Sequence, residues 1–271
     1  MNEYKISILL PTRGRGAALD RSLKSLFDLA DRPEQIQLML GFDKDDTEGL
    51  AAFKESIQPW LDEQDINYTA LLFDPMGYGR LNEYVNTLAK KASADWLVFW
   101  NDDAYMETQG WDTVISSHEQ EFKLLAFHTH KDHPYSIFPI VPKKWLEVLG
   151  YLSLHQLSDA WLSQEAYMLD IWERIPVNVV HDRSDLTGNN DDATFKNRII
   201  YEGNPRDPKD FHHPHNTQLR LLDCEKISVY MKSIGLDITW WENVKLGKQD
   251  PWERLKINDV NGQMRQYNTV L

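Results

Sequence analysis

The first half of the chain alternates short apolar runs with segments whose apolar residues recur at helical spacing, and this alternation constrains the fold more than any other feature. The apolar runs predict strands at Lys5–Leu10, Ile36–Phe42, Tyr68–Phe73 and Trp96–Trp100. The segments between them predict amphipathic helices over Leu19–Phe27, Leu50–Trp60 and Leu81–Ala92. Repeated units of this kind form a mostly parallel sheet with helices on its faces. The expected fold class is therefore α/β, with a Rossmann-like mixed sheet flanked by helices.

Acidic residues follow two of these predicted strands. Asp43 comes directly after the second strand, and Asn101-Asp102-Asp103 follows the fourth. Open α/β sheets place their ligand crevice outside the carboxyl ends of the strands. Neighbouring carboxylates repel each other unless a cation lies between them, and their hard oxygens suit Mg²⁺ or Mn²⁺. A divalent-metal site at this edge is one interpretation, and a turn or a cap of the next helix is the other.

The second half of the chain has a mixed pattern. It predicts short strands near Leu124–His128, Ile137–Val141 and Val177–His181, and helices over Lys143–Leu149, Trp161–Trp172 and Thr217–Ile234. After Asp182 the sequence turns polar, and its last part carries tryptophans without clear periodicity. A lid over the site and a packed tail are both consistent with this last part.

Composition excludes several classes of function. With 29 basic and 42 acidic residues the net charge is −13, which opposes a protein whose main task is to bind nucleic-acid phosphates. The apolar runs are much shorter than the roughly 20 residues that span a bilayer, so we expect no membrane segment. Cys224 is the single cysteine, and the N-terminus lacks the pattern of a signal peptide. We therefore expect a cytoplasmic protein, or one in the host cytoplasm if a phage encodes it.

Four motifs in the first half resemble a known family. Ile6-Ser7-Ile8-Leu9-Leu10-Pro11-Thr12-Arg13-Gly14-Arg15, Asp43, Gly79-Arg80-Leu81-Asn82 and Trp100-Asn101-Asp102-Asp103 look like the nucleotide-sugar domain of family 2 glycosyltransferases of the GT-A fold. Their order and spacing agree with that family over roughly residues 5–112. The resemblance implies a GT-A fold, a nucleoside-diphosphate sugar as donor, most often a UDP-sugar, and Mn²⁺ or Mg²⁺ as cofactor.

The same resemblance implies roles for individual residues. Thr12, Arg13 and Asp43 would hold the base and ribose of the nucleotide, with Asp102 near the ribose. Asp103 would ligate the metal. The Gly-rich turn adds Arg80 and Asn82 to the donor-binding set, with Arg80 supplying positive charge to the diphosphate. Because this sequence reads Asn-Asp-Asp where many relatives have Asp-X-Asp, the assignment between the two aspartates stays open.

The second half resembles a group of glycosyltransferase-like proteins of phages and bacteria. The matching segments are Pro139-Ile140-Val141, Lys144-Trp145-Leu146, Leu149-Gly150-Tyr151, Ser158-Asp159-Ala160-Trp161, His181-Asp182-Arg183 and Leu186-Thr187-Gly188-Asn189-Asn190. The resemblance implies that Asp159 is the catalytic base and that His181 completes the metal site. Glu165, Asp182 and Asp185 are rival bases, Asp159 is also suited to an N-cap, and His181 is also suited to a hydrogen bond with Asp182.

Together the two resemblances predict a GT-A domain over residues 1–200, with a nucleotide-sugar half at 1–112 and an acceptor-side half at 113–200. A C-terminal helical or irregular extension over 201–271 is then a candidate lid. The predicted activity is inverting hexosyl transfer from a nucleoside-diphosphate sugar to a hydroxyl acceptor. Three alternatives remain: sugar transfer to a hydroxymethylated base of phage DNA, nucleotidyl transfer, and a non-catalytic saccharide-binding domain. The sequence leaves the acceptor and the oligomeric state open.

Overall fold

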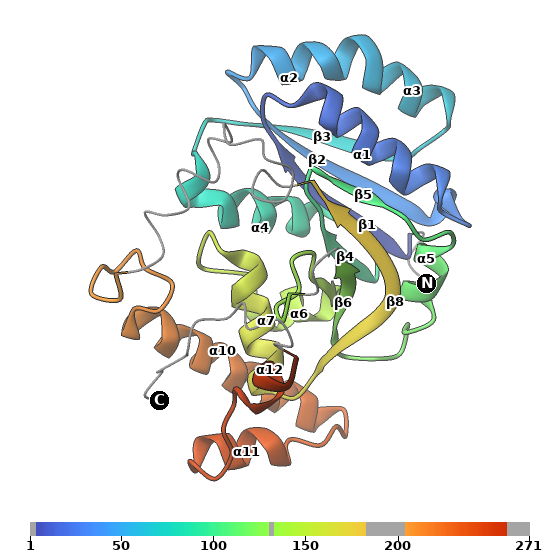
Figure 1. Cartoon of the computed structure of the whole chain (residues 1–271). Helices are drawn as coiled ribbons and strands as arrows, with labels where there is room; N and C mark the ends of the chain where they lie inside the picture. Colours follow the sequence, from blue (N-terminus) through green and yellow to red (C-terminus); the bar gives the residue numbers. More distant parts are fainter. Residues whose placement is uncertain (1–3, 130–132, 183–203, 259–271) are drawn as a thin grey trace.

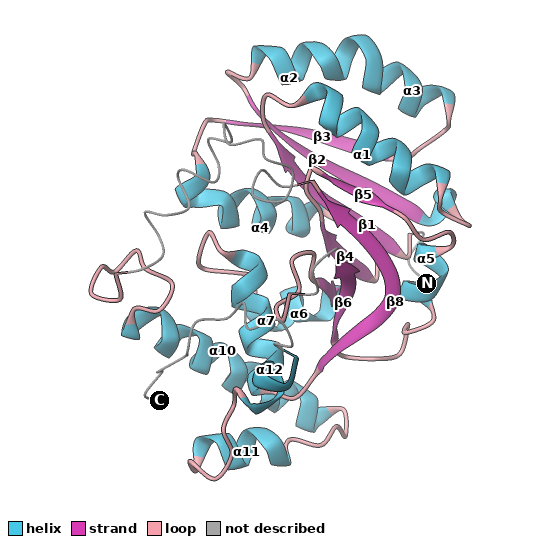
Figure 2. Cartoon of the chain, in the orientation of Figure 1, coloured by secondary structure: helices cyan, strands magenta, loops and turns pink. Residues whose placement is uncertain are grey.

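The computed structural model describes residues 4–129, 133–182 and 204–258 (Figure 1). Their centre is an eight-stranded mixed sheet with the strand order β3-β2-β1-β4-β7-β6-β8-β5 (Figure 2). The strands are β1 (Ile6–Thr12), β2 (Ile36–Asp43), β3 (Tyr68–Phe73), β4 (Trp96–Phe99), β5 (Ala104–Met106), β6 (Leu124–Thr129), β7 (Ile140–Pro142) and β8 (Trp172–His181). The predicted α/β class, with a mixed sheet flanked by helices, is confirmed.

The parallel half of the sheet comes from the first half of the chain, as predicted. β1 pairs in parallel with β2 on one side and β4 on the other, and β3 extends the sheet beyond β2. These central strands are covered on both faces, which is why β2 is buried along its whole length and reads as a continuous apolar run. The chain therefore reverses its direction of growth at β1, and the carboxyl ends of β1 and β4 flank a topological switch point.

The other half of the sheet differs from the prediction in detail. The helix predicted over Trp161–Trp172 ends at Met168, and Trp172 is instead the first residue of β8. Asp170 lies between them with a φ of +55°, a left-handed conformation that ends the helix. β5 and the helix α5 (Trp111–Ser116) were not predicted, because elements of three and six residues are too short to show a period.

Helices cover both faces of the sheet (Figures 1 and 2). On one face lie α1 (Gly16–Asp28), α2 (Thr47–Ala52), the π-helical turn η2 (Phe53–Ile57) and α3 (Gln58–Glu63). On the other lie η3 (Tyr78–Arg80), α4 (Leu81–Lys91), α6 (Lys143–Leu149) and α7 (Ser158–Met168). The remaining short turn is η1 (Pro33–Gln35), which leads into β2. In α1 the buried residues Leu19, Leu23 and Leu26 form one stripe, which is the pattern that predicted this helix.

The described part of the predicted C-terminal extension packs against the main domain. It contains α10 (Pro214–Ser233), α11 (Thr239–Lys245) and α12 (Glu253–Asn258). Cys224, Ile227 and Trp241 belong to the same buried cluster as residues of α6 and α7. This segment is therefore a packed layer in the structure, while the domain boundaries and the role as a lid remain predictions. Among the described helices, none has the length and apolar character that crossing a bilayer requires.

Candidate active site at the switch point

The predicted site begins where β1 and β4 end side by side. Thr12 closes β1, and its hydroxyl donates a hydrogen bond to Asp102 Oδ2 over 2.6 Å. Asp103 accepts a 2.8 Å hydrogen bond at its backbone carbonyl from the backbone N–H of Asp182, just past the end of β8. The Asn101–Asp103 turn thus contacts the ends of two other strands. A rigid frame of this kind holds side chains in fixed positions at the place where open sheets bind ligands.

The loop after β1 is held by Asp46. Its Oδ2 accepts a hydrogen bond from the backbone N–H of Gly14 at 2.9 Å, and its Oδ1 caps α2 through the backbone N–H of Gly49 at 3.0 Å. Gly14 has a φ of +67°, a conformation that favours glycine. This turn directs Arg13 toward β2 and Arg15 toward the aspartate pair.

Asp43, at the end of β2, is held from two sides. Arg13 Nη1 lies 2.6 Å from its Oδ2, and the hydroxyl of Tyr84 donates a hydrogen bond to its Oδ1. Burial and the neighbouring carboxylate raise the pKa of Tyr84, so the phenol stays protonated and keeps donating. Arg13 also pairs with the exposed Asp45. Asp43 is 5 % exposed and each of its oxygens has a second lone pair, so it can accept further hydrogen bonds from a ligand.

Arg15 is the counter-ion of the aspartate pair. Its Nη2 lies 2.6 Å from Asp102 Oδ1 and its Nη1 lies 3.1 Å from Asp103 Oδ2. Burial raises the pKa of Asp102 to about 6 although Arg15 acts in the opposite direction. At Asp103, burial opposes ionisation, yet His181 and Arg15 outweigh it and lower the pKa. The sequence analysis did not include Arg15 in the site, and its position two residues beyond Arg13 was the available signal.

His181 ends β8 beside Asp103. Its Nε2 lies 3.3 Å from Asp103 Oδ1, and its ring packs edge-on against Phe138 with 5.1 Å between the ring centroids. The alternative partner suggested by the sequence was Asp182. In the structure the carboxylate of Asp182 pairs with Arg21 at 2.7 Å, whereas His181 lies beside Asp103.

The donor set around Asp103 fits a hard divalent cation. Asp102 Oδ1, Asp103 Oδ1 and His181 Nδ1 are buried atoms without a hydrogen-bond partner among the described residues. Arg15 Nη1 donates a hydrogen bond to Asp103 Oδ2, whereas Arg15 Nη2 beside Asp102 Oδ1 and His181 Nε2 beside Asp103 Oδ1 lie at ion-pair distance without a hydrogen bond. Carboxylate oxygens and an imidazole nitrogen suit Mn²⁺ and, less well, Mg²⁺. As the structure places them, these three residues do not bring one ligand atom each within 4.8 Å of one another, so a bound ion would contact at most two of them without rearrangement, and phosphates and water would supply the other ligands.

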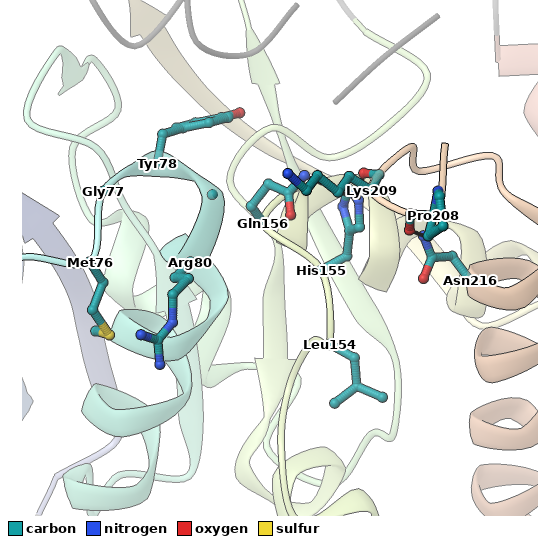
Figure 3. Close-up of a pocket in the computed structure, with 11 residues that line it drawn as sticks. Met76, Gly77, Tyr78, Arg80, Leu154, His155, Gln156, Pro208, Lys209 and Asn216 are labelled. Carbon is teal, nitrogen blue, oxygen red and sulfur yellow. Dashed lines mark hydrogen bonds between the residues drawn. The ribbon is translucent and has the colours of Figure 1, made fainter. Parts of the chain in front are cut away.

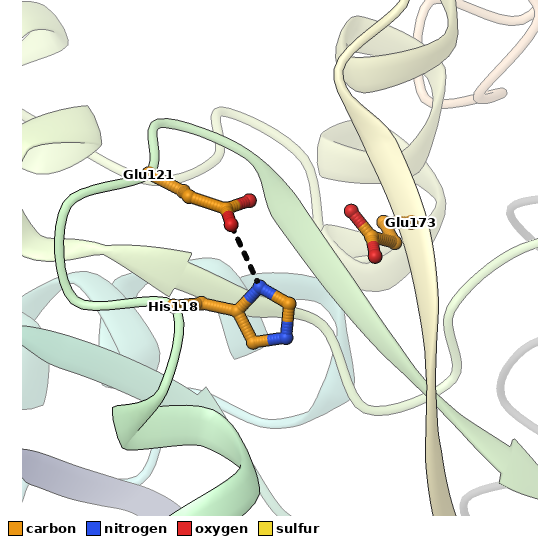
Figure 4. A group of neighbouring side chains, drawn as sticks. All are labelled: His118, Glu121 and Glu173. Atoms are coloured by element: carbon orange, nitrogen blue, oxygen red, sulfur yellow. Dashed lines mark ion pairs between the residues drawn. The ribbon is translucent and has the colours of Figure 1, made fainter.

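A second group of potential ligands includes Glu173 near the start of β8, whose other end carries His181. His118, Glu121 and Glu173 bring three such atoms within 4.8 Å of one another (Figure 4). Lys123 already lies between the carboxylates, with its Nζ 2.8 Å from Glu121 Oε2 and 2.7 Å from Glu173 Oε2. The ammonium group supplies the positive charge that a metal would bring, so we interpret this group as a structural ion-pair network.

Three predicted site residues lie outside the network around Asp43 and Asp103. Arg80 is exposed and pairs with Glu83 on the next turn of the chain. Asn82 makes a long 3.5 Å hydrogen bond to the carbonyl of Ser153. Asp159 is half-buried in the first turn of α7, where Leu157 is the N-cap residue, so the alternative role of Asp159 as an N-cap is wrong. The rival base Asp185 lies outside the described residues.

Glu165, another rival base, is buried within the protein. It is 0 % exposed, and the indole N–H of Trp145 donates to its Oε2 over 3.3 Å. Burial raises its pKa well above the ordinary value, and the charge of Asp223 on α10 adds to the effect. Asp223 in turn accepts a 2.5 Å hydrogen bond from the hydroxyl of Tyr151. The position of Glu165 between α7 and α10 argues against contact with a substrate.

Substituting Glu165 by glutamine should therefore change the pH dependence of stability. The unfolded carboxyl ionises near 4.5, whereas the folded one stays protonated to higher pH. Between these pKa values the folded protein holds one more proton, so its free energy of unfolding falls by up to about 1.4 kcal/mol per pH unit as pH rises. Glu165→Gln should lack this fall in urea titrations between pH 4 and 8. The exposed Glu63→Gln is the control, and parallel curves for Glu165→Gln and the parent would contradict the assignment.

Comparisons with known proteins place this geometry in a fold. No protein-family model matches the sequence, and no curated protein matches it. Among solved structures, residues 1–349 of S. aureus TarS with UDP-GlcNAc match with a TM-score of 0.59 and 11 % identity, over 81 % of this chain and 66 % of that one. The mannosyltransferase PcManGT from Pyrobaculum calidifontis, with GDP-Man and Mn²⁺, matches with a TM-score of 0.55 and 10 % identity, over 96 % and 88 %. The fold is that of the GT-A glycosyltransferases.

This chain spans only part of the length of the TarS structures that it matches. The chain covers 60 % of TarS 1–349 in its UDP complex and 37 % of a longer TarS structure. At 10–13 % identity the similarity concerns the fold. The predicted GT-A fold is thus confirmed, while membership of family 2 and of the phage and bacterial group stays a prediction.

Proposed function

We propose that this protein is a divalent-metal-dependent glycosyltransferase that moves a sugar, with inversion, from a nucleoside-diphosphate sugar to a hydroxyl acceptor. The observation that carries the proposal is the buried Asp102–Asp103 pair at the switch point. One carboxylate oxygen of each aspartate accepts no hydrogen bond from a described residue, and that of Asp103 lies beside His181. Matching structures hold UDP, UDP-GlcNAc, or GDP-Man with Mn²⁺, which supports a nucleotide sugar as donor. We propose UDP as the nucleotide.

In this proposal the nucleoside lies along the ends of β1 and β2. Asp43 accepts hydrogen bonds from the base or ribose, since Arg13 and Tyr84 fix its orientation and leave lone pairs available. The hydroxyl of Thr12 fixes Oδ2 of Asp102 through a hydrogen bond, and Oδ1 of Asp102 faces Arg15. In this proposal these residues bind and orient the nucleotide.

Asp103 is the residue we propose as the direct metal ligand, with His181 beside it. Its side chain is 13 % exposed whereas that of Asp102 is 1 % exposed, so Asp103 can contact a bound ion with the smaller rearrangement. A bound Mn²⁺ or Mg²⁺ would stabilise the negative charge that develops on the departing diphosphate. Arg15 supplies positive charge at the same place. Arg80, the last residue of η3 and directly before α4, is a further candidate for contact with the diphosphate.

Asp159 is the base that we propose for the acceptor hydroxyl. In an inverting transfer a carboxylate removes the proton of the hydroxyl as its oxygen attacks the anomeric carbon, on the face opposite the leaving group. Asp159 makes no ion pair with another residue that the structure describes, and it is half-buried in the first turn of α7. Asp182 is a weaker candidate because Arg21 already pairs with it.

The proposal is tested by ligand-dependent stability followed by a turnover screen. A ligand that binds the folded state alone raises the melting temperature by mass action, so UDP with Mn²⁺ should stabilise the protein more than UDP with a chelator does. Release of UDP from a panel of nucleotide sugars then tests transfer. Binding without turnover would indicate a saccharide-binding domain, and pyrophosphate release from NTP and sugar phosphate would indicate a nucleotidyltransferase. Absence of any stabilisation by UDP or GDP with Mn²⁺ would refute the proposal.

A further inference from the structure

A pocket of about 540 Å³ lies between the main domain and the C-terminal layer (Figure 3). Three parts of the chain line it: the turn at 76–80, the segment at 154–156 that leads into α7, and residues 208–209 with Asn216 at the start of α10. Its volume is in the range of pockets that bind small molecules. The site derived above does not include this pocket, apart from Arg80.

The lining of this pocket is cationic in an acidic protein. Arg80 and Lys209 line it and no aspartate or glutamate does, although the whole chain has a net charge of −13. Lys209 is exposed and forms no ion pair within the described ranges. Arg80 uses Nε and Nη2 for Glu83, which leaves Nη1 as a donor toward a ligand. Two cations without a carboxylate in the wall favour an anionic ligand.

His155 fixes the backbone beside Lys209. Its Nε2 lies 3.0 Å from the carbonyl oxygen of Lys209, and because a carbonyl can only accept, this nitrogen carries the hydrogen. Its Nδ1 accepts a 3.2 Å hydrogen bond from the backbone N–H of Leu157. Burial lowers the pKa of His155, which favours the neutral ring, and the two hydrogen bonds select the tautomer with the hydrogen on Nε2. The ring therefore joins the segment before α7 to the C-terminal layer and leaves the Lys209 ammonium for the pocket.

The segment around Lys209 is also held from its other side. Asp210 Oδ1 and Oδ2 each accept a 2.8 Å hydrogen bond, from the backbone N–H of His212 and of Asn204. Asn216 Nδ2 donates to the carbonyl of Asp210 over 2.7 Å. The pocket wall is thus formed before a ligand arrives, which lowers the entropic cost of binding. Figure 3 shows Lys209 beside Gln156 and His155, facing the turn that carries Tyr78 and Arg80.

We propose that this pocket binds the acceptor, and that the acceptor is a small saccharide carrying a phosphate or carboxylate group that Lys209 recognises. The inference rests on the proposed transferase function and adds the substrate class. Gln156 lines the pocket three residues before Asp159, and Asp159 lies close enough to His155 for its charge to act on the imidazole. Asp159 itself does not line the pocket, and in this proposal a saccharide whose anionic group contacts Lys209 extends past Gln156 to bring a hydroxyl to this base.

The test compares matched neutral and anionic sugars on the UDP- and Mn²⁺-saturated protein. Isothermal titration with glucose, glucose 6-phosphate and glucuronate, and with the galactose and N-acetylglucosamine counterparts, should give at least about tenfold tighter binding for an anionic member than for its neutral partner. Lys209→Gln should remove this preference and Lys209→Arg should keep it. Lys232→Gln, at an exposed lysine of α10, should leave it unchanged. Saturating UDP prevents the sugar phosphates from being read as donor-site ligands.

Several outcomes would overturn the inference. It is contradicted if neutral and anionic sugars bind equally or if neither binds. It is also contradicted if Lys209→Gln keeps the full preference for the anionic sugar, or if a short oligonucleotide binds more tightly than any sugar phosphate. Lys209 is exposed and its backbone is held by His155, so the variants are expected to fold, and unchanged UDP binding in them verifies this. Failure of the parent to bind UDP with Mn²⁺ would instead refute the transferase function itself.

Discussion

Replacing Asp103 by alanine should reduce Mn²⁺-dependent UDP binding by at least about 100-fold and abolish turnover. Loss of a group that only orients a metal ligand already costs 10–100-fold in affinity, and Asp103 is proposed as the ligand itself. The substitution also leaves Arg15 and His181 without the carboxylate that both approach. Metal-free UDP binding, which we assign to Asp43 and its partners, should change little. Isothermal titration of UDP with Mn²⁺ and with a chelator measures both quantities.

The matched control is at the other end of the same strand. Asp95 directly precedes β4, as Asp102 and Asp103 follow it, and its carboxylate pairs with Lys5 at 3.3 Å. Asp95→Asn should therefore bind UDP and Mn²⁺ as the parent does. Asp103→Asn separates charge from size, since it keeps the shape and removes the negative charge. If Asp103→Ala and the parent show the same increase in UDP affinity on adding Mn²⁺, the metal assignment is wrong.

The fold could be predicted where periodicity is long and local. The strands of the parallel half and the helices between them were identified because their apolar residues follow a local pattern. The missed elements, β5 and α5, are short and depend on distant contacts. The backbone N–H of Met106 in β5 donates to the hydroxyl of Ser25 in α1, an interaction that no local pattern encodes.

The sequence predicted which site residues lie at the strand ends, but not all of the side chains that they contact. Strand ends located Thr12, Asp43, Asp102 and Asp103, because parallel strands bring their carboxyl ends to one edge. The partner of Asp43 that the sequence analysis missed is Tyr84, which lies 41 positions further along the chain. Its place in the periodic pattern of α4 assigns it to the buried face, and the pattern carries no information on which polar group its hydroxyl meets.

The surroundings of Arg80 also could not be predicted from the sequence. The Gly-rich turn was predicted to bind the donor, which stays a prediction, and glycine permits the φ of +71° at Gly77 that opens the turn. In the structure this turn forms a wall of the pocket, and Lys209 of the C-terminal layer lies in the same lining. The two cations are separated by more than a hundred positions in the chain, so only the folded structure brings them into one pocket.

Asp159→Asn should lower kcat by about 10²- to 10⁴-fold, the usual contribution of a positioned general base, and should leave UDP and Mn²⁺ binding within twofold of the parent. The amide keeps the size of the carboxylate but cannot take up the proton of the acceptor hydroxyl. We assign UDP binding to the ends of β1, β2 and β4, whereas Asp159 belongs to α7, on the proposed acceptor side. Steady-state UDP release under saturating donor, together with titration of UDP, measures the two effects separately.

The control for this variant lies on the same helix. Glu165→Gln makes the same chemical change two turns further along α7, at a carboxyl that is buried against Trp145 and Asp223. If Asp159 is the base, Glu165→Gln keeps the parent turnover while Asp159→Asn loses it. Parent-like turnover in Asp159→Asn would exclude this residue and shift the assignment to Asp182, whose pairing with Arg21 would then have to open for it to reach the acceptor. The comparison works because both substitutions replace one carboxyl group on the same helix by an amide, and Glu165 is buried whereas Asp159 is half-buried at the start of the helix.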